Sequence, residues 1–146
     1  MLVAPSSTRR MLTLLSLGIA LTACGPKPPR KQIDEQGNSV ASWAATAEMV
    51  AAAWLRGELP DHYARQTLQS GAQQVERARA SLARVAAGDS LARAAVREYG
   101  RLADRLARMT AALQRQDRSA LSESTDQLPN EARRIRALRE RSRSGS

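Results

Sequence analysis

Residues 90–114 carry the sequence SLARAAVREYGRLADRLARMTAALQ, which decides the fold. Apolar side chains recur along it at alternating spacings of three and four residues, at Ala92, Ala95, Tyr99, Leu102, Leu106, Met109 and Leu113. This spacing places them on one face of an α-helix. The stretch therefore predicts a long amphipathic helix that packs against other helices along a single apolar stripe.

Two earlier stretches of the chain show the same alternation. Between residues 60 and 87 the stripe consists of Ala64, Leu68, Gly71, Val75, Ala78, Leu82 and Val85. Between residues 39 and 55 it consists of Val40, Trp43, Ala47, Val50 and Trp54. Gly57 and Pro60 separate these two stretches, and Gly88-Asp89-Ser90 reads as a stop followed by a new helix cap. We therefore expect three helices joined by short turns.

A fourth helical segment follows the polar break at residues 114–118. Its stripe consists of Leu121, Leu128, Ala132, Ile135 and Leu138. Pro129 must kink or split this segment, because proline removes a backbone donor inside a helix. Residues 142–146 are polar, and we expect a disordered tail there.

The four segments predict an all-α fold over residues 39–141. Short connections imply antiparallel neighbours, so an up-down-up-down four-helix bundle is the simplest arrangement that buries all four stripes. A long helical hairpin with loosely packed flanking helices is the alternative. Alanine occupies many stripe positions and buries little area, which predicts modest stability or self-association into a homo-oligomer.

The overall composition excludes several kinds of site. The chain has 146 residues, one Cys, one His and a formal net charge of +9, and of its 23 basic residues only Lys27 and Lys31 are lysine. A disulfide scaffold, a Cys/His zinc site and any site needing two histidines from one chain are excluded. We expect no metal and no cofactor.

The first 24 residues have the organisation of an export signal. Arg9 and Arg10 precede an uncharged stretch, MLTLLSLGIALTA at residues 11–23, that is shorter than the roughly 20 residues needed to span a bilayer. The stretch ends in Leu21-Thr22-Ala23-Cys24. A short uncleaved anchor ending in a free Cys24 is the alternative interpretation.

The motif Leu21-Thr22-Ala23-Cys24 resembles the lipobox of bacterial lipoproteins. The resemblance implies cleavage between Ala23 and Cys24, with residues 1–23 removed, and a diacylglyceryl group on the Cys24 thiol. It further implies palmitate or a similar acyl chain on the new amino terminus and anchoring to a membrane of the cell envelope. Gly25 after the cysteine favours the outer membrane, facing the periplasm, over the inner membrane or the cell surface. Residues 8–12 also resemble a twin-arginine export signal, although the usual continuation is missing.

Residues 24–38 are expected to form the lipidated amino terminus and an extended tether. Three prolines in five residues favour a polyproline-like conformation. Lys27, Arg30 and Lys31 would then lie close to anionic headgroups. A solvated spacer without such contacts is the alternative and the more common use of a segment of this composition.

No catalytic constellation can be assembled from the remaining residues. His62 lies near a helix start without partners, and Glu48 is expected to flank the core and meet an arginine. Three serines, Ser119, Ser122 and Ser124, have no histidine to activate them. We therefore expect no enzymatic activity.

The positive charge is concentrated near the ends of the chain, in the expected tether and in the arginine-rich residues 133–143. Because the lipobox implies export, nucleic acid is not an expected partner, and anionic envelope polymers or envelope proteins become the plausible ones. The alternative, which is slightly favoured, is a solvated face without a specific partner. The expected function is that of a structural or interaction module. The alternative is a periplasmic module that binds a small ligand or client protein through the helix bearing Trp43 and Trp54, although core packing is the more common use of such residues.

Overall fold

Five helices follow one another in the computed structural model, which describes residues 27–145. They are α1 (Pro29–Leu55), α2 (Asp61–Ala83), α3 (Ser90–Gln114), α4 (Arg118–Asp126) and α5 (Leu128–Ser144). No strand occurs among the residues described. The prediction of an all-α helical bundle is confirmed.

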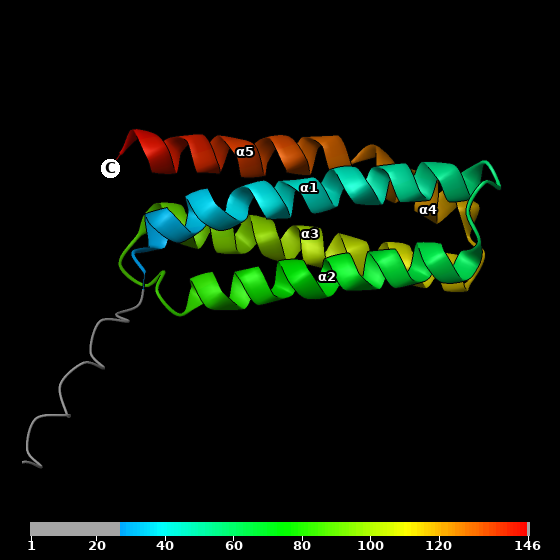
Figure 1. Ribbon diagram of the computed structural model, residues 1–146, viewed down its shortest axis with the longest axis horizontal. Coiled ribbons are helices and arrows are strands. Elements are labelled where there is room, and N and C mark those ends of the chain that lie inside the picture. The colour runs from blue at the N-terminus through cyan, green and yellow to red at the C-terminus, as the bar shows by residue number, and fades with distance from the viewer. Residues whose placement is uncertain (1–26, 146) are drawn as a thin grey trace, which may run out of the picture.

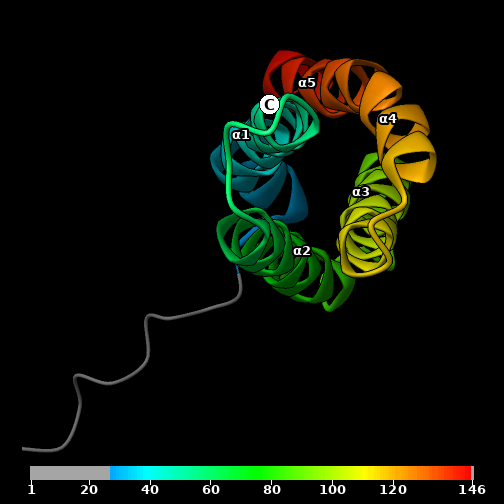
Figure 2. The ribbon, with the colours of Figure 1, turned by 90° about the vertical axis from the view of Figure 1, so that its right-hand side faces the viewer.

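Four rods lie side by side along the long axis of the bundle and run alternately in opposite directions, as Figure 1 shows. Helices α4 and α5 together form the fourth rod. Seen from one end, the helices form a ring in the order α1, α2, α3, α4, α5 (Figure 2). Helix α2 contacts only α1 and α3, whereas α1 and α3 each contact all the other helices. The first helix of the chain is therefore packed against the last one.

Local sequence signals set the helix ends. Gly57 adopts a φ of 75° directly after α1, a conformation that glycine accepts without steric cost. The Asp89 carboxylate caps α3 by accepting hydrogen bonds from the backbone N–H groups of Leu91 (2.8 Å) and Ala92 (3.0 Å). Asp117 caps α4 in the same way through the N–H of Ala120 (3.0 Å).

The segment around Pro129 is split rather than kinked. Helix α4 ends at Asp126, and α5 begins at Leu128 after the single residue Gln127. Pro129 lies in the first turn of α5, where its missing N–H costs no helical hydrogen bond. The break allows α4 to lie across the end of α3 while α5 runs along α1.

The expected extended tether over residues 24–38 is wrong for residues 29–38, because α1 already begins at Pro29. Proline is accepted in the first turn of a helix, so Pro28 and Pro29 start the helix instead of preventing it. Ile33 and Gly37 are buried at spacings that continue the stripe from Val40. These residues pack α1 against α5.

The expected tail from residue 142 is also wrong, because α5 continues to Ser144. Ser142 is 1% exposed, and its hydroxyl donates a hydrogen bond to the carbonyl oxygen of Arg139 at 2.6 Å. The end of α5 is ordered because it packs beside the start of α1.

The predicted stripes form the core. All seven stripe residues of α3 and all five of the fourth segment are buried, and the core cluster runs from Ile33 to Leu138. In α1 the buried seam is largely alanine, at Ala41, Ala44, Ala47 and Ala51. Because the whole core lies within this range, the chain from residue 24 onward keeps every core contact.

None of the helices within residues 27–145 is long and apolar enough to cross a membrane.

We predict that Gly71→Ala destabilises the bundle. A Cβ atom at Gly71 would lie 2.8 Å from Cε3 of Trp43 and 3.3 Å from Cδ1 of Leu106, so the indole ring must shift. Overpacking costs about 1–3 kcal/mol and the gain in helix propensity returns about 1 kcal/mol, which leaves a net loss of about 1 kcal/mol. Urea unfolding followed by circular dichroism measures the difference.

Gly37→Ala is the matched control. Its Cβ would lie 3.4 Å from Cβ of Arg139 and 3.5 Å from the Tyr99 hydroxyl, which are ordinary contacts. This variant should be as stable as the wild type or more stable, because only the propensity gain remains. Equal stability of the two variants would contradict the seating of Trp43 on Gly71.

Candidate functional site

The expected lipidation and cleavage site, Ala23-Cys24, lies outside the described residues, as does the rest of the lipobox. The other residues that the sequence singles out can be placed.

The two tryptophans of α1 serve helix packing. Trp54 is 4% exposed, and its indole N–H donates a hydrogen bond to Oδ1 of Asp61 at 2.7 Å. The guanidinium of Arg118 lies 5.3 Å from the centroid of the Trp54 ring, which is within cation–π distance. Trp43 is half-buried against Gly71. The expected core packing is thus confirmed for Trp54, while Trp43 fills the seam between α1 and α2.

The remaining catalytic candidates lie on the surface. His62 is exposed and its ring lies 4.2 Å from that of the neighbouring Tyr63. Glu48 is also exposed and forms no ion pair within residues 27–145, so the expected arginine partner is wrong. Among the same residues no group of three His, Cys, Asp or Glu side chains is placed to hold a metal ion.

A groove lined by arginines runs along α3 where it faces α4 and the start of α5, and we call it the arginine groove. Two adjoining recesses form it, of about 450 Å³ and about 260 Å³. They share Arg105, Arg108 and Gln127. The basic residues that line the groove are Arg101, Arg105, Arg108, Arg115 and Arg134, and the acidic ones are Asp104, Glu123 and Glu131.

The helical period explains why these arginines gather. Arg101, Arg105 and Arg108 are spaced by four and three residues, which places them on one face of α3. Arg134 joins them from α5 because α3 and α5 are in contact. The groove therefore has five basic and three acidic side chains, an excess of two positive charges.

A buried ion pair forms the floor of the groove. Nε of Arg105 lies 2.7 Å from Oε1 of Glu131, and the two side chains are only 17% and 5% exposed. The pair joins α3 to α5, and Glu131 has a second oxygen, Oε2, without a hydrogen-bond partner among the described residues. Loss of Arg105 would leave a buried carboxylate uncompensated, which is strongly unfavourable. This pair fixes the position of the groove walls.

Two arginines of the groove are available to a ligand. Arg108 and Arg115 are exposed and form no ion pair within the described part of the chain. Arg101, by contrast, donates to Oε1 of Glu98 at 2.8 Å. Guanidinium groups free of internal partners can donate paired hydrogen bonds to carboxylate or phosphate.

The groove brings Arg134, from the arginine-rich residues 133–143 near the end of the chain, beside the arginines of α3. Its excess of positive charge is only two. The period of α3 alone could predict the row of arginines. That Arg134 lies beside this row depends on which helices are neighbours, and no local sequence pattern specifies that.

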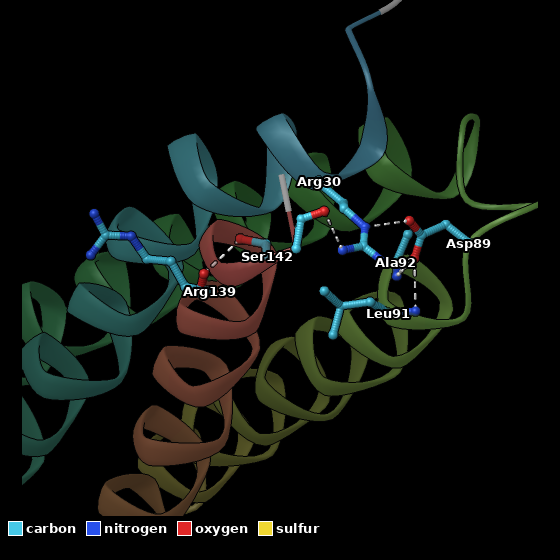
Figure 3. A network of polar contacts seen from close by, with 7 residues as sticks. Arg30, Asp89, Leu91, Ala92, Arg139 and Ser142 are labelled. Carbon is cyan, nitrogen blue, oxygen red and sulfur yellow. Dashed lines mark hydrogen bonds and ion pairs between the residues drawn. The ribbon is translucent and has the colours of Figure 1, made fainter.

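A second polar region lies where the start of α1 meets the end of α5, shown in Figure 3. Nε of Arg30 lies 3.2 Å from Oδ2 of Asp89, and Nη1 of Arg30 donates to the carbonyl oxygen of Gly145 at 3.1 Å. Arg139 and Arg143 each place Nε 3.0 Å from Oδ1 of Asp34. These contacts tie both ends of the described chain to the α2–α3 turn.

The backbone N–H of Ala92 holds the pKa of Asp89 below its ordinary value, and Arg30 and the N–H of Leu91 act in the same direction. Each of these groups stabilises the ionised carboxylate. The stability of the α3 cap therefore depends on whether the carboxylate of Asp89 is ionised.

Comparison with known proteins gives no match: no protein-family profile, no curated protein and no solved structure is significantly similar to the chain. The candidate surfaces are therefore interpreted from their own chemistry.

We predict that Asp89 contributes to acid sensitivity. Because its pKa is lower in the folded state, the stabilisation is present above the ordinary aspartate pKa of about 3.9 and is lost as the pH falls through the folded pKa. Asp89→Asn keeps a capping side chain but removes both the titration and the ion pair with Arg30. Its melting temperature should be lower than that of the wild type at pH 7, and the difference should shrink at pH 3.

Thermal melts followed by circular dichroism at both pH values measure this effect. Other carboxylates, such as Asp61, also have lowered pKa values, so both proteins lose stability in acid and only the difference between them is informative. A constant difference across the pH range would contradict the role of Asp89.

Proposed function

We propose that the protein is a lipid-anchored helical lipoprotein of the bacterial cell envelope and acts as a structural or interaction module without catalytic activity. One observation carries the proposal, namely the motif Leu21-Thr22-Ala23-Cys24 directly behind a basic start and an uncharged stretch. This is the order of features that export and lipid attachment require. Two or three acyl chains at Cys24 would hold the protein firmly, because each buried CH₂ contributes about 0.8 kcal/mol.

The proposed location is the outer membrane, with the bundle in the periplasm. Gly25 follows the cysteine, and the resemblance to lipoproteins with a residue other than Asp at this position supports outer-membrane sorting. In an exported protein, the basic surface meets envelope components and not nucleic acid.

The arginine groove is the proposed interaction surface. Its free guanidinium groups, Arg108 and Arg115, favour an anionic envelope polymer or an acidic segment of an envelope protein. The buried pair of Arg105 and Glu131 holds the groove open in one geometry, so a ligand meets a preformed surface.

The alternative, a ligand site built on the helix of Trp43 and Trp54, has weaker support. The Trp54 indole is buried and already bonded to Asp61, and Trp43 is seated against Gly71. Both rings are therefore engaged in packing within the bundle.

The lipid anchor predicts that radiolabelled palmitate is incorporated into the wild-type protein and not into Cys24→Ala. The reason is that the thiol of Cys24 is the acceptor of the first lipid group, and later acylation depends on it. Expression in a bacterial host followed by electrophoresis and autoradiography measures the label. Ser39→Ala, a change outside the motif, serves as a control and should label normally. Labelling of Cys24→Ala would exclude the proposed anchor.

If the arginine groove is the interaction surface, removing its two free arginines should weaken binding to an anionic polymer more than removing two arginines elsewhere. With inorganic polyphosphate as the probe, the double variant Arg108→Gln/Arg115→Gln should bind roughly tenfold more weakly, since two exposed charge contacts contribute about 1 kcal/mol or slightly more in total. Arg77→Gln/Arg97→Gln makes the same change in charge on exposed residues outside the groove. Fluorescence anisotropy measures both affinities. An equal loss in the two double variants would show that the polymer senses only net charge.

A further inference from the structure

The fold gathers separate parts of the chain at one end of the bundle. The start of α1, the end of α5 and the turn between α2 and α3 all lie there, at the left of Figure 1. The ion pair of Arg30 with Asp89 joins the start of α1 to the α2–α3 turn (Figure 3). The pairs of Asp34 with Arg139 and Arg143 join α1 to the end of α5. We call this surface the basic end.

The basic end carries an excess of positive charge. Its basic residues are Lys27, Arg30, Lys31, Arg84, Arg93, Arg139, Arg141 and Arg143. Its acidic residues are Asp34, Glu35, Asp89 and Glu140, so eight basic residues face four acidic ones and the excess is four. The turns at the opposite end, residues 56–61 and 115–118, carry three basic and three acidic residues, an excess of zero.

The acidic residues of the basic end are mostly neutralised from within. Asp34 is paired with Arg139 and Arg143, Asp89 with Arg30, and Glu35 with Lys27. Four exposed cations of this end, Lys31, Arg84, Arg93 and Arg141, have no ion pair within residues 27–145. These four come from the start of α1, the C-cap of α2, the first turn of α3 and the last turns of α5.

The chain length between Cys24 and α1 restricts what can face a membrane. Pro29 follows Cys24 by five residues, and an extended chain spans at most about 3.6 Å per residue, so the start of α1 can lie no more than about 18 Å from the anchor. Helix α1 has 27 residues and is about 40 Å long. With lipids on Cys24, the start of α1 therefore stays within about 18 Å of the anchor, whereas the other end of α1 can lie about 40 Å farther away.

We propose that the basic end is a membrane-contacting surface that binds the headgroups of anionic phospholipids. Its orientation rests on the proposed lipid anchor, but its affinity for anionic lipid does not. Charge complementarity supports this partner, because basic side chains close to an anionic leaflet are attracted within about one Debye length, near 8 Å at physiological salt. A recess of about 560 Å³ lies at this end. Its charged lining residues are Arg30, Lys31 and Arg143 together with Asp34 and Asp89, and both carboxylates are paired with arginines.

The test separates this surface from the lipid anchor. The chain from residue 24 onward with Cys24→Ser carries no lipid and keeps the whole core. It should bind vesicles of phosphatidylglycerol and phosphatidylethanolamine in sedimentation assays, bind vesicles of phosphatidylcholine at least tenfold more weakly, and lose binding as salt is raised. Failure to bind the anionic vesicles overturns the proposal, whatever palmitate labelling shows.

A pair of triple variants locates the binding surface. Lys31→Gln/Arg84→Gln/Arg141→Gln removes three of the four cations of the basic end that have no ion pair within residues 27–145, and it should weaken binding to the anionic vesicles at least tenfold. Arg77→Gln/Arg97→Gln/Arg136→Gln removes three exposed arginines from the sides of the bundle and should weaken it less than threefold. Circular dichroism verifies that both variants are folded. Equal losses in the two variants overturn the proposal, because binding would then depend on net charge and not on this end.

Discussion

The small side chains of α1 allow this helix to contact all the others, and the arrangement of the bundle depends on that. Its buried positions between Ala41 and Ala51 are alanines, so the neighbouring backbones can approach closely. Such a seam buries little apolar area, and the larger side chains of α3 compensate with Tyr99, Leu102, Leu106 and Met109. Trp43 on Gly71 follows the same principle, because the ring fits only where the facing helix has no side chain. Substitutions that enlarge the seam should therefore affect several interfaces at once.

Periodicity predicted the core well because each buried stripe repeats at three and four residues within a single helix. The stripe of α3 and that of the fourth segment are buried at every predicted position. Pro28 and Pro29 misled the prediction of a tether, because proline-rich composition is typical of extended chains although proline also suits the first turn of a helix. The spacing of Ile33, Gly37 and Val40 contained the correct signal. The meeting of Arg134 with the α3 row could not be predicted, since it depends on long-range packing of α5.

Charge has two different uses along the bundle. At the arginine groove, a buried pair between Arg105 and Glu131 holds two helices in a fixed relation while exposed arginines remain beside it. At the basic end, ion pairs between Arg30 and Asp89 and between Arg139 and Asp34 fasten the two termini of the fold. At the basic end internal pairing involves three of the four acidic groups, whereas at the groove it involves only Glu131. The remaining cations then face outward with few internal partners.

The contact between α1 and α5 also determines the order in which the chain can fold. Helices α2 and α3 are neighbours in sequence and can pair as soon as both have been made, whereas α1 must wait for α5 to cover its second side. A bundle of this topology therefore closes only when the last residues of the chain arrive. A chain that crosses a membrane from its amino terminus would stay open during passage and would close after its carboxyl end had passed through. Closure would then pack α5, the last helix to cross, against α1, the first helix to cross.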